Sequence, residues 1–144
     1  MLNRTLGLGL LGLLLTAPIA AAGDLVVIVN AANPVASMDA KAVKAHYLKS
    51  SPTWDGGEKI RPVDLDSPER AAFLAKVLGM TATDLERFWI EKQYAGGDNP
   101  PTKAPDEAGV IKLVKTFKGG IGFVSKAAAA AAGADVKVIL SVAY

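Results

Sequence analysis

Apolar positions along the chain follow two alternating patterns from Gly23 onward. Short apolar runs, typical of strands, occur at residues 25–29, 59–64, 121–124 and 136–142. Apolar residues at helical spacing occur within residues 39–49, 68–78, 83–94, 106–117 and 125–132. We expect residues 25–29 to form the central strand and the Gly- and Pro-rich residues 96–105 to form a loop. The alternation predicts an α/β fold, a three-layer sandwich with helices on both faces of a mostly parallel sheet.

The first 22 residues have the composition of an export signal. Arg4 precedes an apolar stretch from Leu6 to Leu15, and the small residues Ala20 to Ala22 end the segment. A membrane-spanning helix needs about 20 apolar residues, so this stretch is short for one. We expect residues 1–22 to be a signal peptide cleaved near Ala22, and residues 23–144 to form one domain. The alternative is an uncleaved N-terminal anchor.

Composition removes several function classes. The chain has no Cys and only His46 as a histidine, which excludes disulfides, thiol nucleophiles, lipid attachment at Cys and a His-rich metal cluster. Its 16 basic and 14 acidic residues give a formal net charge of +2, which does not argue for a nucleic-acid partner. No nucleophile, base and orienting group come together in the sequence. We therefore expect no enzyme, no catalytic residue, no metal and no cofactor, and an exported hydrolase is the weakest alternative.

The segment from Asp66 to Arg70 is the main candidate site, because a strand signal leads there directly into a helix start. Such a junction puts free backbone N–H groups and the positive end of a helix dipole at the carboxyl edge of a sheet. Ser67 could donate its hydroxyl to an anion, and Arg70 could add charge. In the alternative, Ser67 caps the helix, Pro68 takes its first position and Glu69 offsets the dipole, with no ligand. Spacing alone favours the cap.

Other residues with chemical potential have simpler interpretations. His46 lies at the edge of the apolar helix face without a Ser or Asp pattern nearby, which indicates a structural or surface role. Trp89 has the spacing of a core residue, whereas Trp54 lies in a Gly/Pro loop, where packing and contact with a partner are equally good interpretations. Gly119 to Gly122 lack the Lys-Ser/Thr of a phosphate loop and precede a strand, so they indicate a turn.

Four blocks of sequence resemble a known family in their order. They are "VVIVNAANPVASMDAKAVKAHYLKSSPTW", "IRPVDLDSPERAAFL", "FWIEKQYAGGDNPP" and "GGIGFV". Together they resemble the phosphate ABC transporter substrate-binding proteins, specifically their short, single-lobe periplasmic relatives. The resemblance covers about residues 25–124, and no single block is diagnostic. It implies one lobe of a type 2 periplasmic binding protein over residues 23–144 and a location in the periplasm.

The resemblance also implies a function and a set of contacts. It implies a periplasmic solute-binding-like protein for phosphate or another small oxyanion, serving a membrane transporter or sensor. Ser67 and Arg70 match positions of the family's binding turn, and we expect the turn from Asn30 to Asn33 to contribute if it lies beside them. Full-length members close two lobes over the ligand, so a second copy or another periplasmic protein would complete the cleft. The alternative is a non-binding adaptor or protein-docking module that has lost the anion site.

Overall fold

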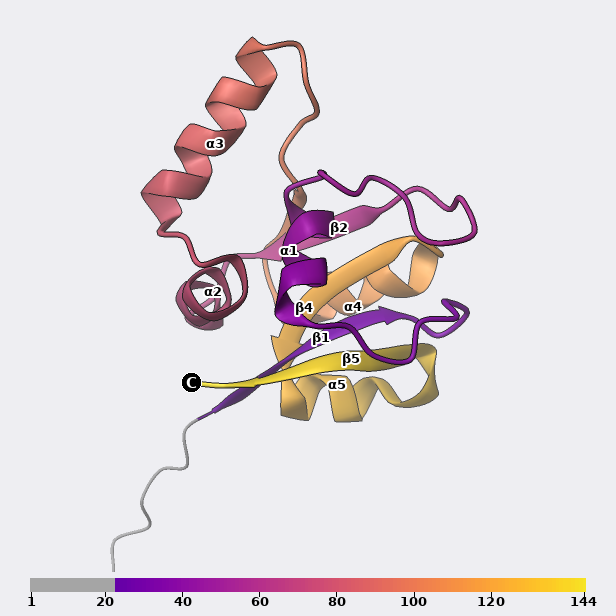
Figure 1. The fold of residues 1–144 in the computed structure, drawn as a ribbon. Helices are drawn as coiled ribbons and strands as arrows, with labels where there is room; N and C mark the ends of the chain where they lie inside the picture. Colours follow the sequence, from indigo (N-terminus) through magenta and orange to yellow (C-terminus); the bar gives the residue numbers. More distant parts are fainter. Residues whose placement is uncertain (1–22) are drawn as a thin grey trace, which may run out of the picture.

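Five strands form one sheet in the order β3-β2-β4-β1-β5 in the computed structural model, which describes residues 23–144 (Figure 1). The strands are β1 Asp24–Asn30, β2 Arg61–Leu65, β3 Thr102–Ala104, β4 Gly120–Ser125 and β5 Val136–Ala143. The helices are α1 Ala40–Tyr47, α2 Glu69–Phe73, η1 Leu74–Leu78, α3 Ala82–Tyr94, α4 Glu107–Thr116, α5 Lys126–Ala132 and η2 Gly133–Asp135. None of these described helices is long and apolar enough to cross a membrane. The predicted signal peptide lies outside the described residues.

Strand directions confirm a mostly parallel sheet and correct one position within it. β2 pairs in parallel with β3 and β4, whereas β1 is antiparallel to both β4 and β5. β1 therefore runs against the other strands, and β4, not β1, is central. The side chains of β1 from Leu25 onward are buried because it is an interior strand with neighbours on both sides. A continuous apolar run indicates an interior strand but not which interior position it takes.

β3 is a strand that the sequence analysis assigned to a loop. Residues 102–104 pair with residues 63–65 of β2 and form one edge of the sheet. Two of its three residues are exposed, and Pro100 and Pro101 precede it, so it carries no apolar pattern that could have predicted it.

Polar side chains determine where the helices begin. Asp39 caps α1, since its carboxylate accepts a hydrogen bond from the Ala42 N–H at 2.8 Å. Thr81 and Asp84 form a capping box at the start of α3. Asp106 caps α4, and its carboxylate accepts a hydrogen bond from the Gly109 N–H at 2.7 Å.

The two faces of β4 show how the layers pack. Phe123 packs on the α1 and α2 side, where its ring lies 6.3 Å from that of Tyr47 in α1 and stacks on Phe73 in α2 with centroids 4.0 Å apart. Gly122 faces α4, and a Cβ there would lie 2.4 Å from a methyl carbon of Val110. α4 and α5 thus cover the opposite face from α1 and α2, and glycine allows α4 to approach the sheet closely (Figure 1).

α3 stands apart from the three layers, and the chain loops back from it to β3 at the sheet edge (Figure 1). Leu85 and Trp89 on one side of the helix are buried. Ile90 and Tyr94 are 57% and 94% exposed. One face of this helix is therefore covered by the domain and the other is open.

Candidate functional site

Ser67 lies in the turn between the end of β2 at Leu65 and the start of α2 at Glu69. The predicted Ser67 side-chain cap is wrong, because Pro68 occupies the cap position in helical conformation and no side-chain bond is made there. The Ser67 carbonyl accepts a hydrogen bond from the Arg70 N–H at 3.1 Å. Its hydroxyl oxygen is buried and has no hydrogen-bond partner among residues 23–144. The backbone holds this turn, and the Ser67 hydroxyl makes no hydrogen bond within it.

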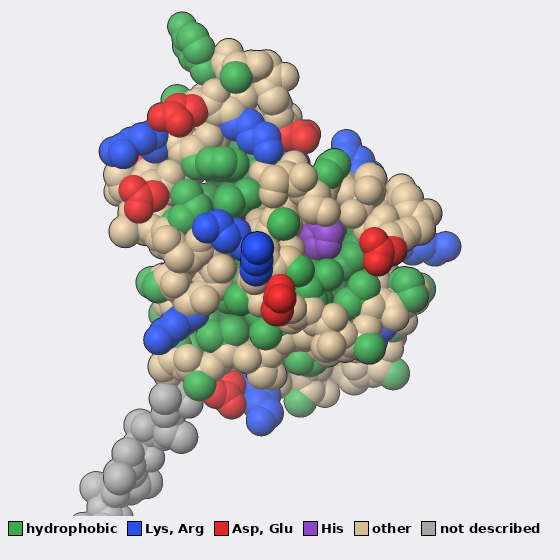
Figure 2. Space-filling view, viewed as in Figure 1, with side chains coloured by type: hydrophobic (Ala, Val, Ile, Leu, Met, Phe, Trp, Pro, Cys, Tyr) green, Lys and Arg blue, Asp and Glu red, His purple; other side chains and the backbone are tan. Residues whose placement is uncertain are grey.

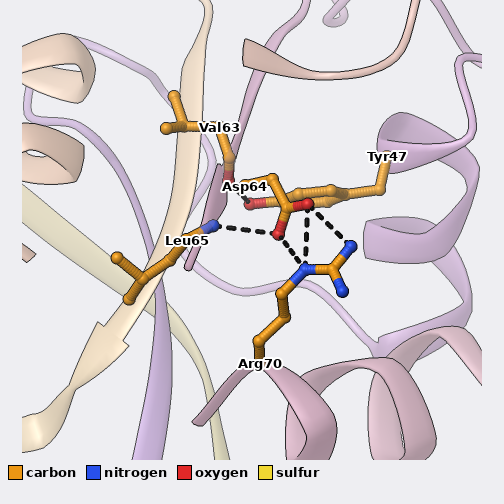
Figure 3. Close-up of polar contacts among 5 residues, drawn as sticks. All are labelled: Tyr47, Val63, Asp64, Leu65 and Arg70. Carbon is orange, nitrogen blue, oxygen red and sulfur yellow. Dashed lines mark hydrogen bonds and ion pairs between the residues drawn. The ribbon is translucent and has the colours of Figure 1, made fainter. Parts of the chain in front are cut away.

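Arg70 is fixed at the carboxyl end of β2 by Asp64 (Figure 3). Its Nε lies 3.0 Å from each carboxylate oxygen of Asp64, and its Nη2 lies 3.0 Å from Oδ2. The same carboxylate accepts a hydrogen bond from the Leu65 N–H at 2.9 Å. The Arg70 and Asp64 side chains are 22% and 13% exposed, so the ion pair is only partly screened by water. The ion pair with Asp64 thus fixes the position of the Arg70 guanidinium, and Arg70 follows Ser67 by three residues in the sequence.

Tyr47 lies beneath this ion pair and is a fixed hydrogen-bond donor (Figure 3). Its hydroxyl donates to the Val63 carbonyl at 2.8 Å. Burial, and then the negative charge of Asp64, raise the pKa of Tyr47 well above its ordinary value. The phenol therefore stays protonated at neutral pH and supports the strand end that carries Asp64.

Both the amide nitrogen and the oxygen of the Asn30 side chain make hydrogen bonds within the protein. Its side-chain amide donates to the carbonyls of Val114 and Lys115 at 3.0 Å each and of Phe117 at 3.3 Å. Its side-chain oxygen accepts the N–H of Ala32 at 2.8 Å. Asn30 thus joins the end of β1 to the C-terminal end of α4.

The structure does not bring the Asn30 turn together with the Ser67 turn. β1 runs against β2 and β4, so Asn30 lies level with the start of β2 while Ser67 follows its end. The side-chain oxygen of Asn33 accepts the Val35 N–H at 2.9 Å, and its carbonyl accepts a hydrogen bond from Lys137. A binding role for Asn30 and Asn33 would require a site separate from Ser67 and Arg70.

A groove of about 580 Å³ lies between α3 and the β2–β3 edge of the sheet, and we call it the α3 groove. Its lining includes Arg70, Trp89, Ile90, Pro100, Pro101 and Lys103. Trp89 is buried as predicted, but its indole N–H has no hydrogen-bond partner among residues 23–144. No local sequence signal marks this groove, because its walls come from three separate segments and one of them, residues 100–103, has the composition of a loop.

His46 and Trp54 are structural residues. The His46 Nδ1 lies 2.8 Å from the Ser51 carbonyl oxygen, and its ring packs on Trp54 with centroids 4.5 Å apart. The Trp54 indole N–H donates to the Gly119 carbonyl at 3.1 Å, which resolves the choice left open for this residue in favour of packing. Within residues 23–144, no three His, Cys, Asp or Glu side chains group as a metal site would require.

The three-layer α/β architecture is shared with parts of solved phosphate-binding proteins. No protein-family model and no curated protein matches the sequence. Solved structures do match. A protein assigned as a phosphate ABC transporter substrate-binding protein, with bound phosphate, from Clostridium perfringens shares 18% identity with a TM-score of 0.64. An ABC-type phosphate transport receptor from Vibrio cholerae shares 22% with a TM-score of 0.64, and a possible phosphate binding protein from Planctomyces limnophilus shares 17% with a TM-score of 0.60.

These matches cover 83% of this chain but only 45%, 46% and 41% of the respective solved chains. The chain therefore spans less than half the length of the structures that it resembles. The predicted fold class and the resemblance to one lobe of phosphate ABC transporter substrate-binding proteins are confirmed. At these identities the likeness establishes the fold, and binding has to be argued from the residues of this chain.

Proposed function

We propose that this protein is an exported solute-binding-like protein of the periplasm that binds phosphate or another small oxyanion at the Ser67 turn. The observation that carries the proposal is the buried Ser67 hydroxyl, which has no partner among the described residues and is followed three positions later by Arg70. A buried hydroxyl without a partner is unfavourable, and an oxyanion would accept its hydrogen bond. In the first turn of α2, Pro68 has no N–H and the Arg70 N–H is bonded to the Ser67 carbonyl, so the proposed contacts come from the Ser67 and Arg70 side chains.

The solved structures support this proposal through their descriptions. The Clostridium perfringens protein is described with bound phosphate, and the Vibrio cholerae protein as a phosphate transport receptor. By analogy, the present chain would deliver its ligand to a membrane transporter or signal its presence to a sensor. Since it spans less than half of their length, a second copy or another periplasmic protein would close the site.

The test is a calorimetric titration of the purified protein with phosphate and with sulfate. We expect saturable binding that weakens at least about tenfold in Ser67→Ala and in Arg70→Gln, because each removes one ligand contact. Arg61→Gln is the matched control, since Arg61 is exposed at the opposite end of β2 and contacts the Phe117 ring. The absence of saturable binding, or binding that neither variant weakens, would contradict the proposal.

One observation favours a second function, that of a non-binding adaptor or protein-docking module. Asp64 already neutralises Arg70 through a bidentate ion pair, so the guanidinium is satisfied without a ligand. In an adaptor this pair would simply stiffen the surface at the end of β2. Asp64→Asn distinguishes the two functions in the same titration, because freeing Arg70 strengthens anion binding at a working site and produces no binding in an adaptor.

A further inference from the structure

The α3 groove has a composition that inorganic phosphate alone would not use. Trp89, Ile90, Pro100 and Pro101 give it apolar walls, and these residues lie beside the polar pair of Asp64 and Arg70. Figure 2 shows hydrophobic side chains gathered over α3 with charged side chains around them. Its volume of about 580 Å³ is within the size range of small-molecule sites.

Arg70 connects this groove to the Ser67 turn. Its backbone N–H is bonded to the Ser67 carbonyl, and its side chain lines the α3 groove. Lys103 lines the same groove and has no carboxylate within 4.0 Å among residues 23–144. The groove thus has cationic groups contributed by both α2 and β3.

Two buried polar atoms without partners mark the two parts of this surface. One is the Ser67 hydroxyl in the turn, and the other is the Trp89 indole N–H in a groove residue that is 5% exposed. Apolar ligand atoms would pack on the Trp89 ring and on the proline rings, and this contact would change the surroundings of the Trp89 indole. Inorganic phosphate at the Ser67 turn would leave the apolar walls bare.

We propose that the α3 groove binds the organic part of a small phosphomonoester whose phosphate occupies the Ser67 and Arg70 site. This inference rests on the proposed function and narrows it from inorganic phosphate to its small organic esters. Glu86 also lines the groove, and its negative charge opposes the ligand there. Its neutral variant Glu86→Gln should therefore bind the ester more tightly than the unchanged protein.

Phenyl phosphate is the probe, with inorganic phosphate as its matched reference. We expect phenyl phosphate to bind about tenfold more tightly or better, since the groove removes its ring from water. The readout is the pair of indole N–H signals in a two-dimensional ¹⁵N–¹H NMR spectrum. The Trp89 signal should shift with saturation, whereas the Trp54 signal should stay, because its N–H is bonded to the Gly119 carbonyl.

Variants separate the groove from the turn. Ile90→Asn should reduce the preference for phenyl phosphate about tenfold and leave inorganic phosphate binding as it was. Val138→Asn also replaces a β-branched apolar side chain by Asn, at a 43%-exposed position on β5 outside the groove, and serves as the control. Phenol, which has the ring but no phosphate, should bind far more weakly than phenyl phosphate.

The outcomes distinguish this inference from the proposed function. Equal affinities for the two phosphates with an unmoved Trp89 signal would overturn the inference while the phosphate site stands. Phenol binding as tightly as phenyl phosphate would also overturn it, because the groove would then act without the anion. Failure of both phosphates to bind would remove the inference and the proposed function together.

Discussion

The turns after β1 and β2 both carry short polar side chains, yet they use them in opposite ways. At the end of β1, Asn30 donates to three carbonyl groups and accepts one N–H. At the end of β2, the hydroxyl of Ser67 is buried and has no partner among the described residues. The hydrogen-bonding groups of the Asn30 side chain are all used within the protein, whereas the Ser67 hydroxyl makes no hydrogen bond to the described residues.

Strand direction explains the difference. β1 is the antiparallel strand, so its end meets the C-terminal end of α4, where carbonyls lack intrahelical partners and an amide can donate to them. β2 runs parallel to β3 and β4 and leads into a helix start, where no helix carbonyl is left without a partner. The Ser67 carbonyl accepts the Arg70 N–H, and the Ser67 hydroxyl finds no acceptor among the described residues. An external acceptor suits the Ser67 end, and the Asn30 end has no such need.

The largest effect that tests this comparison is the loss of Asn30. Asn30→Ala should lower the free energy of unfolding by about 2 to 4 kcal/mol, because it removes the amide donor from the buried Val114 carbonyl and from the partly buried Lys115 carbonyl. Urea denaturation followed by circular dichroism measures the change. Asn33→Ala is the control, and it should cost only about 1 kcal/mol, since its side chain accepts one backbone N–H. Equal losses in the two variants would show that Asn30 is not the main connection between β1 and α4.

The alternation of strand and helix patterns predicted the layers of the fold, but not the direction of β1. A run such as Leu25 to Val29 reports burial on both faces, which is the same for a parallel and an antiparallel interior strand. The strand β3 was missed for a different reason. Its pairing with β2 is a long-range contact made by exposed residues, and such a contact has no local signature.

The candidate site could be predicted in part. Ser67 and Arg70 were identified because a strand running into a helix start is visible in the sequence. The ion pair with Asp64 was not foreseen, because it depends on how a side chain of α2 folds back over β2. Asn30 and Ser67 lie at opposite ends of the sheet because β1 is antiparallel to β4 whereas β2 is parallel to it. The pattern of apolar residues in the sequence does not report the direction of a strand.

Tyr47 tests whether the core beneath the Ser67 end is tightly built. Its pKa is raised by burial and by Asp64, so above about pH 10 the unfolded chain loses the phenolic proton while the folded chain keeps it. The contribution of Tyr47 to the free energy of unfolding is therefore fully present below about pH 10, and above that pH it should fall by about 1.4 kcal/mol per pH unit. Urea midpoints measured from pH 8 to 11 report this slope.

Tyr47→Phe provides the comparison for that slope. At pH 8 this variant should have a free energy of unfolding about 1 kcal/mol lower than the unchanged protein, because the hydrogen bond to the Val63 carbonyl is lost. Above pH 10 its free energy of unfolding should fall less steeply with pH than that of the unchanged protein. Tyr94→Phe changes a 94%-exposed side chain and should leave both the value at pH 8 and the slope as they are. An unchanged slope in Tyr47→Phe would mean that the phenol becomes accessible to water without unfolding, and the Ser67 end would then be loosely packed.

The smallest effect is the most direct test of the difference between the two turns. Ser67→Ala should leave the free energy of unfolding within about 1 kcal/mol of its original value or raise it, because the hydroxyl has no partner to lose. Ser125→Ala is the matched control. The Ser125 hydroxyl accepts the Ala128 N–H at 3.2 Å and donates to Glu107 at 3.1 Å, so its loss should cost about 1 to 2 kcal/mol. If Ser67→Ala costs as much as Ser125→Ala, the fold also uses the Ser67 hydroxyl, and no donor is left there for an anion.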